Sequence, residues 1–182
     1  MIRSLLGFAL ILFASVSCAQ AQGTDPQNTL VIETTKGPIR IKLRPDLAPK
    51  HVAQIKALAR KGFYDGTPFH RVIPGFMAQG GDPTGTGTGG SDLPDLKAEF
   101  TNTPFKRGTV GMARSQDPDS ANSQFFICFD DASGLNGDYT VWGEVVSGME
   151  FVDALKKGTE ANNGQVDNPD KLIKLQVAAD AK

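Results

Sequence analysis

One stretch of the sequence places a cation and large apolar side chains at spacings that could form a binding groove. Residues 69–82 read Phe-His-Arg-Val-Ile-Pro-Gly-Phe-Met-Ala-Gln-Gly-Gly-Asp, which is typical of two short strands joined by a Pro-Gly turn. Because side chains alternate along a strand, Arg71 is expected to share a face with Phe69 and Ile73. A charge in such surroundings needs a partner or a function, so Arg71 is either paired with an acid or part of a site.

Amide and aromatic side chains on two strands could complete this groove. Met77 and Gln79 are expected on one face of the second strand. Further along, residues 123–129 read Ser-Gln-Phe-Phe-Ile-Cys-Phe, a strongly apolar strand in which Gln124 and Phe126 share a face. A cation, two amides and several large apolar residues could hold an apolar ring and hydrogen-bond the peptide on either side of it.

The composition is that of one globular domain without a charge bias. The chain has 182 residues, enough for a sizeable core, and its 19 basic and 20 acidic residues nearly cancel. This balance gives no indication of binding to nucleic acid or to a membrane surface. No nucleophile stands beside a base, and the two histidines, His51 and His70, do not form a ligand cluster. We therefore predict no metal, no cofactor and no nucleic-acid partner.

Most of the remaining chain predicts short strands and two helices, without βαβ alternation. Alternating residues predict a hairpin around Lys36-Gly37 and a closing strand in which Ile173, Leu175 and Val177 share a face. About seven or eight strands with two helices favour an antiparallel barrel or sandwich with helices at its ends. Outside the first stretch, the expected strands lie at residues 30–34, 39–44, 109–113, 123–129, 139–146 and 172–177.

The two helices are predicted from apolar stripes and end signals. Residues 46–62 carry Pro49 at a first-turn position and apolar side chains at helical spacing. His51 lies off the apolar stripe and is expected to be solvated. The second helix is predicted to begin at residues 147–150, whose spacing is that of a capping box, and to end at Gly158.

Residues 84–90 form a glycine-rich segment between these elements. Gly85, Gly87 and Gly90 have the spacing of a dinucleotide-binding loop. Such a loop opens a helix, whereas the sequence Ser-Asp-Leu-Pro follows here. A flexible surface loop is therefore expected.

The first residues have the pattern of a secretory signal peptide. Arg3 supplies a positive start, an apolar run extends from residue 5 to residue 16, and small residues stand at Ala19 and Ala21. This arrangement predicts cleavage before Gln22 and export of the chain. It also predicts that no membrane-spanning segment remains after processing.

Cys18 provides an alternative to plain secretion, namely lipid attachment at this cysteine. Ser15 stands where lipidated precursors usually carry a larger aliphatic residue, which favours plain secretion. An uncleaved membrane helix is a third possibility, but the apolar run is short for a bilayer. After processing, Cys128 is the remaining cysteine, so no internal disulfide can form. Its apolar strand predicts a buried and inert thiol.

Three blocks of the sequence, residues 69–77, 79–82 and 123–127, resemble the signature blocks of the cyclophilins, the cyclophilin-type peptidyl-prolyl cis-trans isomerases. The resemblance extends from about residue 29 to about residue 177. It implies a mainly β fold, an eight-stranded antiparallel closed barrel capped by two α-helices. The chain would then divide into a signal peptide at residues 1–21, a short leader at 22–28 and an isomerase domain at 29–180.

The resemblance also implies roles for individual residues. Arg71 matches the catalytic arginine, and Gln79 and Gln124 match amides that hold the substrate backbone or position this arginine. Ala113 and Arg114 lie where the chain of family members runs beside the bound peptide. Members use the backbone at the second of these positions, so its side chain is free to vary. The pocket that receives the proline ring is matched by Phe76, Met77, Phe126 and Leu135.

Two positions depart from the best-known eukaryotic pattern and resemble bacterial secreted members. Gly134 stands where many members carry a tryptophan, and Tyr139 where they carry a histidine. Isomerisation is still expected, with Tyr139 closing the pocket. Cyclosporin binding is expected to be weak, because the tryptophan contributes to that contact. A monomer in the periplasm, or secreted, is expected.

The activity implied by the resemblance is rotation of X-Pro peptide bonds in exported proteins that are folding or unfolded. Arg71 stays charged and presents several donors, so it could stabilise a lone pair on the prolyl nitrogen while an apolar pocket holds the ring. The alternative is a non-catalytic module or holdase that binds extended peptides in the same groove. The presence of Arg71 favours the enzyme.

Overall fold

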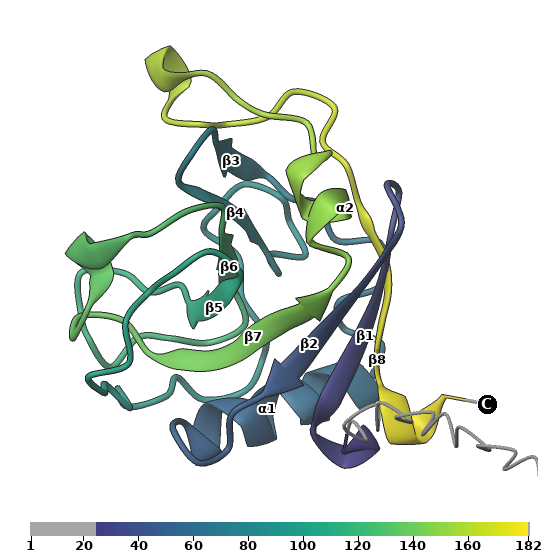
Figure 1. The fold of residues 1–182 in the computed structure, drawn as a ribbon, viewed down its shortest axis with the longest axis vertical. Helices are drawn as coiled ribbons and strands as arrows, with labels where there is room; N and C mark the ends of the chain where they lie inside the picture. The colour runs from purple at the N-terminus through teal and green to yellow at the C-terminus, as the bar shows by residue number, and fades with distance from the viewer. Residues whose placement is uncertain (1–24, 182) are drawn as a thin grey trace, which may run out of the picture.

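The computed structural model describes residues 25–181. In this part of the chain, eight antiparallel strands form one curled sheet in the order β3-β4-β6-β5-β7-β2-β1-β8 (Figure 1). The predicted signal peptide, its cleavage site and Cys18 lie outside the described residues. The strands are β1 (Thr29–Thr34), β2 (Pro38–Leu43), β3 (Arg71–Ile73), β4 (Met77–Gly80), β5 (Thr109–Met112), β6 (Phe125–Cys128), β7 (Val141–Ser147) and β8 (Leu172–Val177).

The two ends of the sheet meet through the segments that precede β3 and β8. Pro68 forms an isolated antiparallel bridge with Lys171, and the N–H of Phe69 donates to the carbonyl oxygen of Asp170 at 2.9 Å. The predicted fold class, mainly β with eight antiparallel strands and two helices, is confirmed. The sheet is therefore a half-barrel: its edge strands β3 and β8 are linked by this short contact and do not pair in a continuous ladder, so the predicted complete closure of the barrel is not observed.

Helix α1 (Pro49–Arg60) packs its apolar stripe into the core as predicted. His51, on the same helix, is also fully buried, so the prediction that it is solvated is wrong. The carboxylate of Glu99 accepts hydrogen bonds from the backbone N–H groups of Lys50 and His51 at 3.2 and 3.1 Å. It also lies 2.7 Å from His51 Nδ1. Ala48 precedes the helix without a side-chain cap, so the distant Glu99 takes over that role.

The two buried histidines predict a loss of stability in mildly acidic solution. Burial lowers the pKa of His51 and of His70, and Glu99 opposes this at His51 without reversing it. The unfolded chain therefore takes up protons first, and stabilisation present above about pH 6.5 is lost as the pH falls. We expect calorimetry to show a lower thermal midpoint at about pH 5.5 than at about pH 7.5, before carboxylates titrate. A double variant, His51→Asn with His70→Asn, should show a smaller drop; an equal drop would contradict this account.

The side chains of strand β6 point alternately into two hydrophobic clusters, one on each face of the sheet. Phe125 and Ile127 point into the main core between the sheet and α1. Phe126 and Cys128 point into a smaller cluster on the opposite face. Cys128 is buried as predicted, and burial raises the pKa of its thiol to about 12, so little reactive thiolate is present at neutral pH. The smaller cluster forms the support of the site described below.

Helix α2 (Met149–Asp153) is shorter than predicted and has no capping box. Its N-cap is Gly148, whose φ of 83° and close approach to the backbone of Pro38 leave no room for a Cβ atom. Contact with β2 therefore sets the start of this helix. After the helix, the N–H of Gly158 donates to the carbonyl oxygen of Val72 at 2.9 Å, which draws the chain toward β3.

Strand β8 departs from the predicted alternation at one residue. Thr34 pairs with Leu172 and Glu33 with Lys174, so Ile173 has no partner on β1. This β-bulge turns Leu172 into the core and leaves Ile173 52% exposed, contrary to the prediction.

Candidate active site

Three side chains predicted to act together lie in one row across adjacent strands. The register pairs Arg71 on β3 with Gln79 on β4, and Gln79 with Phe126 on β6. The next residue in the row is Gly111 on β5, where a Cβ atom would lie 2.5 Å from Phe126 Cζ. Glycine therefore allows the Phe126 ring to lie over β5. Phe69 is not part of this face: it precedes β3 and packs in the main core, so that prediction is wrong.

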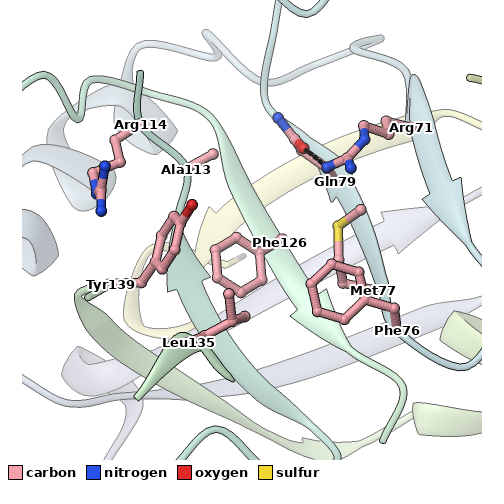
Figure 2. Close-up of a pocket in the computed structure, with 9 residues that line it drawn as sticks. All are labelled: Arg71, Phe76, Met77, Gln79, Ala113, Arg114, Phe126, Leu135 and Tyr139. Carbon is pink, nitrogen blue, oxygen red and sulfur yellow. Dashed lines mark hydrogen bonds between the residues drawn. The ribbon is translucent and has the colours of Figure 1, made fainter. Parts of the chain in front are cut away.

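A cavity of about 190 Å³ opens beside this row (Figure 2). It is smaller than the roughly 300–1,000 Å³ of pockets for drug-sized ligands and suits a single side-chain ring. Of the ten residues that the resemblance implied, Gln124 instead lines a neighbouring cavity of about 620 Å³. The other nine line the small cavity: Arg71, Phe76, Met77, Gln79, Ala113, Arg114, Phe126, Leu135 and Tyr139.

The floor of the small cavity is apolar and closely packed. The Phe126 ring is 5% exposed and stacks on Phe105, with the ring centroids 5.6 Å apart. Tyr139 meets Phe126 edge-to-face at 5.7 Å. Met77 and Leu135 belong to the same cluster. This floor gives the cavity a low local dielectric, which strengthens the electrostatic interactions of a nearby charge.

Arg71 is held by neutral oxygen atoms rather than by an acid. Its Nε and Nη2 donate to the backbone and side-chain oxygens of Asn163, both at 3.0 Å, and its Nη1 donates to Gln79 Oε1 at 3.2 Å. None of the salt bridges among residues 25–181 involves Arg71, which excludes the structural ion pair there. Two of the five guanidinium N–H groups remain for a substrate. Burial lowers the pKa of Arg71, but an arginine remains charged.

A chain of side-chain amides connects Arg71 to the glycine-rich loop. Gln79 accepts from Arg71 and donates through Nε2 to Gln124 Oε1 at 2.9 Å. Gln124 Nε2 donates to the carbonyl oxygens of Gly87 and Gly89 at 3.0 and 2.8 Å. Because only the nitrogen of an amide donates, these carbonyls fix the orientation of Gln124, and Gln124 fixes that of Gln79. The Gln79 oxygen therefore faces the arginine.

The glycine-rich loop is folded around one buried carboxylate. Asp82 accepts hydrogen bonds from the backbone N–H groups of Thr84, Gly87 and Gly89 at 2.7, 2.6 and 3.1 Å. Burial alone would raise the pKa of Asp82, but hydrogen bonds from Thr84, Gly89 and Gly87 lower it overall, so the carboxylate is ionised. The loop that the sequence predicted to be flexible is thus hydrogen-bonded along its inner side.

Replacing Asp82 with asparagine is expected to weaken both the fold and catalysis. The new amide nitrogen would face the N–H groups of Gly87 and Gly89, and leaving such donors unpaired costs about 1–3 kcal/mol. The loop would then orient Gln124 less well, and we expect kcat/KM to fall about tenfold, which corresponds to roughly 1.4 kcal/mol. Chemical unfolding measures the first effect, and an assay of the isomerisation that the resemblance implies measures the second. Asp92→Asn, at an exposed aspartate, is the matched control, and equal behaviour of the two variants would contradict this role.

Asn163 is a member of the site that sequence analysis did not identify. It contacts Arg71 from 92 positions further along the chain. The run Asn162-Asn163-Gly164 indicates a tight turn, and Asn163 indeed has a φ of 56°, but nothing in this run indicates a contact with an arginine. The turn is brought to β3 by a hydrogen bond from the N–H of Val72 to the carbonyl oxygen of Gly164 at 2.7 Å.

No group of three or more histidine, cysteine, aspartate or glutamate side chains between residues 25 and 181 is arranged to hold a metal ion. None of the helices in the same range has the length and apolar character needed to cross a membrane.

Comparison with known proteins identifies the family to which this fold and site belong. Residues 29–177 match the family described as cyclophilin type peptidyl-prolyl cis-trans isomerase/CLD. The chain therefore belongs to the cyclophilin family, and the resemblance predicted from the sequence is confirmed. A probable peptidyl-prolyl cis-trans isomerase of Brucella suis is 58% identical over 193 residues, covering 100% of this chain and 98% of the relative.

Solved structures agree with this assignment. A crystal structure of a cyclophilin from Hirschia baltica has a TM-score of 0.78 and 32% identity, covering 87% of this chain and 77% of that chain. A cyclophilin type isomerase of Cryptosporidium parvum, crystallised in the presence of the dipeptide Ala-Pro, has a TM-score of 0.76 and 30% identity. That match covers 82% of this chain and 98% of the other. The protein is a peptidyl-prolyl cis-trans isomerase, and its substrates are proline-containing peptides.

Proposed function

We propose that Arg71 promotes rotation of the X-Pro bond by donating a hydrogen bond to the prolyl nitrogen, while the small cavity holds the proline ring. The observation that carries this proposal is the row of Arg71, Gln79 and Phe126. It puts two guanidinium N–H groups, which have no partner among residues 25–181, at the edge of a cavity of about 190 Å³ that has an apolar floor. The two parts of an X-Pro unit, the amide and the ring, thus each have a complementary surface.

The chemistry requires no covalent intermediate. Rotation about a peptide bond is opposed by a barrier of ~18–20 kcal/mol, because the C–N bond has partial double-bond character. A donor directed at the nitrogen favours a lone pair localised on that atom, which weakens the double bond. Arginine suits this role because it stays charged and presents its donors in a rigid fork. The apolar floor strengthens the electrostatic effect.

One hydrogen bond supplies only part of the required effect. An acceleration of about five decades corresponds to removing about 7 kcal/mol of barrier. A hydrogen bond to a charged group contributes roughly 1.5–3 kcal/mol. The remainder is assigned to tighter binding of the twisted bond than of either planar isomer, since only such differential binding accelerates the step.

An extended peptide would find further partners beside the cavity. The backbone N–H and carbonyl groups of Arg114 form no hydrogen bond within residues 25–181, so they remain for the substrate main chain. The neighbouring cavity of about 620 Å³ shares Gln79, Ala113 and Arg114 with the small one. This continuity leaves room for residues that flank the proline.

A matched pair of peptides tests the role of the cavity. Replacing the substrate proline with N-methylalanine keeps the tertiary amide and removes the closed ring. We expect kcat/KM to fall at least about tenfold, the scale of losing methylene contacts in an apolar pocket. Equal acceleration of the two peptides would show that the cavity does not hold the ring. Binding of proline peptides without any acceleration would instead support the holdase.

We also propose that the enzyme acts on exported polypeptides, in the periplasm or outside a bacterial cell. The support is the signal-peptide pattern of residues 1–21, which directly precedes the short leader. The intact mass of the protein recovered from the exported fraction tests this. A chain that begins at Gln22 is the expected result, whereas a diacylated Cys18 would show lipid attachment.

Weak cyclosporin binding and a monomeric state complete the proposal. Gly134 lies in the same short 3₁₀ turn as Leu135, and apart from Gly134 itself and its two chain neighbours no atom lies within 4 Å of the place that its Cβ would occupy. A tryptophan would therefore find space at this rim, and Gly134→Trp is expected to raise the cyclosporin affinity measured by calorimetric titration.

Because a single chain lines the cavity, a monomer suffices for the proposed function, and light scattering tests whether the protein is a monomer.

A further inference from the structure

The side chain of Arg114 is held at the rim of the small cavity by backbone carbonyl groups. Its Nε and Nη2 both donate to the carbonyl oxygen of Asp138, at 3.1 and 2.9 Å. Its Nη1 donates to the carbonyl oxygens of Ser115 at 2.9 Å and of Gln116 at 3.4 Å. Four of the five guanidinium N–H groups are thereby engaged, so the planar group has a fixed orientation.

The guanidinium of Arg114 lies against the aromatic ring of Tyr139. The distance from Arg114 Cζ to the Tyr139 ring centroid is 4.6 Å, which is a cation–π contact. The Phe100 ring lies 5.9 Å from the same atom. Tyr139 stands between Arg114 and Phe126 (Figure 2), and it meets Phe126 with ring planes at 87°. The Tyr139 ring is thus a wall of the cavity that has Arg114 behind it.

Tyr139 has few other constraints among the described residues. Its hydroxyl group forms no hydrogen bond with the residues that line the cavity. The chain before it is irregular, and Gly137 has a φ of 79°. The carbonyl group that Arg114 holds belongs to Asp138, which immediately precedes Tyr139 in the chain. One arginine therefore restrains both the backbone at this point and the ring that follows it.

We propose that Arg114 is a positioning residue, whose side chain holds the Tyr139 ring in place as a wall of the proline cavity. The inference rests on the function proposed above for that cavity. It gives the side chain of Arg114 a role distinct from that of its backbone, at a position where the family resemblance implied that the side chain is free to vary. Arg114 acts through Tyr139 and does not contact the reacting bond. A displaced Tyr139 confines the proline ring less well, which raises KM more than it lowers kcat.

Direct binding of the substrate by Arg114 is the competing explanation, because the residue lines both cavities. The hydrogen bonds to Asp138, Ser115 and Gln116 leave one N–H group for such a contact. The two explanations differ in what they predict. Direct contact depends on the charge of the peptide and is independent of Tyr139, whereas positioning depends on Tyr139 and is independent of the charge.

A double-mutant cycle with Arg114→Met and Tyr139→Ala tests the proposal. Isomerisation is measured on two proline peptides, one neutral and one with an acidic residue beside the proline. We expect Arg114→Met to lower kcat/KM about 5- to 10-fold on both peptides, mainly through KM, as losing a cation–π contact and hydrogen bonds at a partly exposed site would do. In the Tyr139→Ala background the same change should have less than about a twofold effect.

Several controls make the cycle decisive. Arg40→Met, at an exposed arginine on β2, should leave the rates unchanged, and thermal melting confirms that each variant is folded. If Arg114→Met does not fold, Arg114→Lys replaces it, because lysine keeps the charge without the planar fork. Independent effects of the two substitutions, or a loss confined to the acidic peptide, would overturn the inference. Arg71→Ala, measured in the same assay, distinguishes failure of this inference from failure of the proposed function. If Arg71→Ala keeps full activity, the proposed catalytic site is wrong.

Discussion

Arg71→Ala is expected to lower kcat/KM by about 10²–10³-fold, the effect of removing one preorganised donor from an active site. The substitution removes the only side chain of the row that can donate a charge-assisted hydrogen bond to the prolyl nitrogen. The affinity for the planar substrate should change little, because the interaction strengthens as the bond twists. Exchange spectroscopy on one proline peptide gives the rate, and a titration of the same peptide gives the affinity.

Arg71→Lys distinguishes charge from geometry. An ammonium group keeps the charge, but its three N–H donors cannot replace the two bonds to Asn163, the bond to Gln79 and a bond to the substrate at once. We expect a loss of about 10-fold or more for this variant, a smaller loss than for alanine. Arg40→Ala on β2 serves as the surface control. Wild-type kcat/KM in Arg71→Ala, or a loss of affinity alone, would remove Arg71 from the catalytic role.

Phe126→Ala is expected to destabilise the fold by about 3–5 kcal/mol, which is typical of deleting a buried aromatic ring. The ring is 5% exposed, stacks on Phe105 and forms the floor of the cavity beside Tyr139. Where the variant remains folded, kcat/KM should fall by at least about 10²-fold, because the proline ring loses its main contact surface. Chemical unfolding and the isomerisation assay report the two effects separately.

Cys128→Ala provides a control for the stability effect. Cys128 lies on β6 and belongs to the same cluster as Phe126, but it does not line the cavity. The Cys128→Ala substitution should destabilise the fold modestly and leave kcat/KM unchanged in the folded protein. Phe126→Leu, which keeps an apolar floor of smaller area, should fall between wild type and alanine. If Phe126→Ala and Cys128→Ala affect kcat/KM equally, the floor has no specific role in catalysis.

The sequence predicted the local parts of this protein well. The Pro-Gly turn joins two strands so short that their register follows from the turn, which places Arg71 opposite Gln79. The alternation in β6 sends Phe126 toward one face and Phe125 toward the other, as predicted. Strand geometry imposes this period of two on contiguous residues, so a short window of sequence carries the information. The ends of the strands shifted by a residue or two, as fraying ends do, whereas α1 begins three residues later and α2 ends five residues earlier than predicted.

The errors arose where a distant segment overrides the local pattern. His51 lies off the apolar stripe of its helix, yet it is buried because Glu99, 48 positions away, binds its ring and caps the helix. Ile173 fits a regular alternation, yet a bulge opposite β1 turns it outward. The contact between Arg71 and Asn163 joins residues 92 positions apart. In each case the residues next to His51, Ile173 or Arg71 in the sequence do not indicate which distant segment contacts it.

The sequence alone therefore determined the family, the face that each site residue occupies on its own strand, and the apolar residues of the cavity floor. Tertiary pairing of β4 with β6 then placed Gln79 beside Phe126. Tertiary structure decided how the arginine is held: by Asn163, and by an amide chain that runs through Gln79 and Gln124 to the loop around Asp82. It also decided that Arg114 lies behind Tyr139. The physical reason is that backbone geometry sets which face a side chain occupies, whereas hydrogen-bond partners depend on which distant segments pack together.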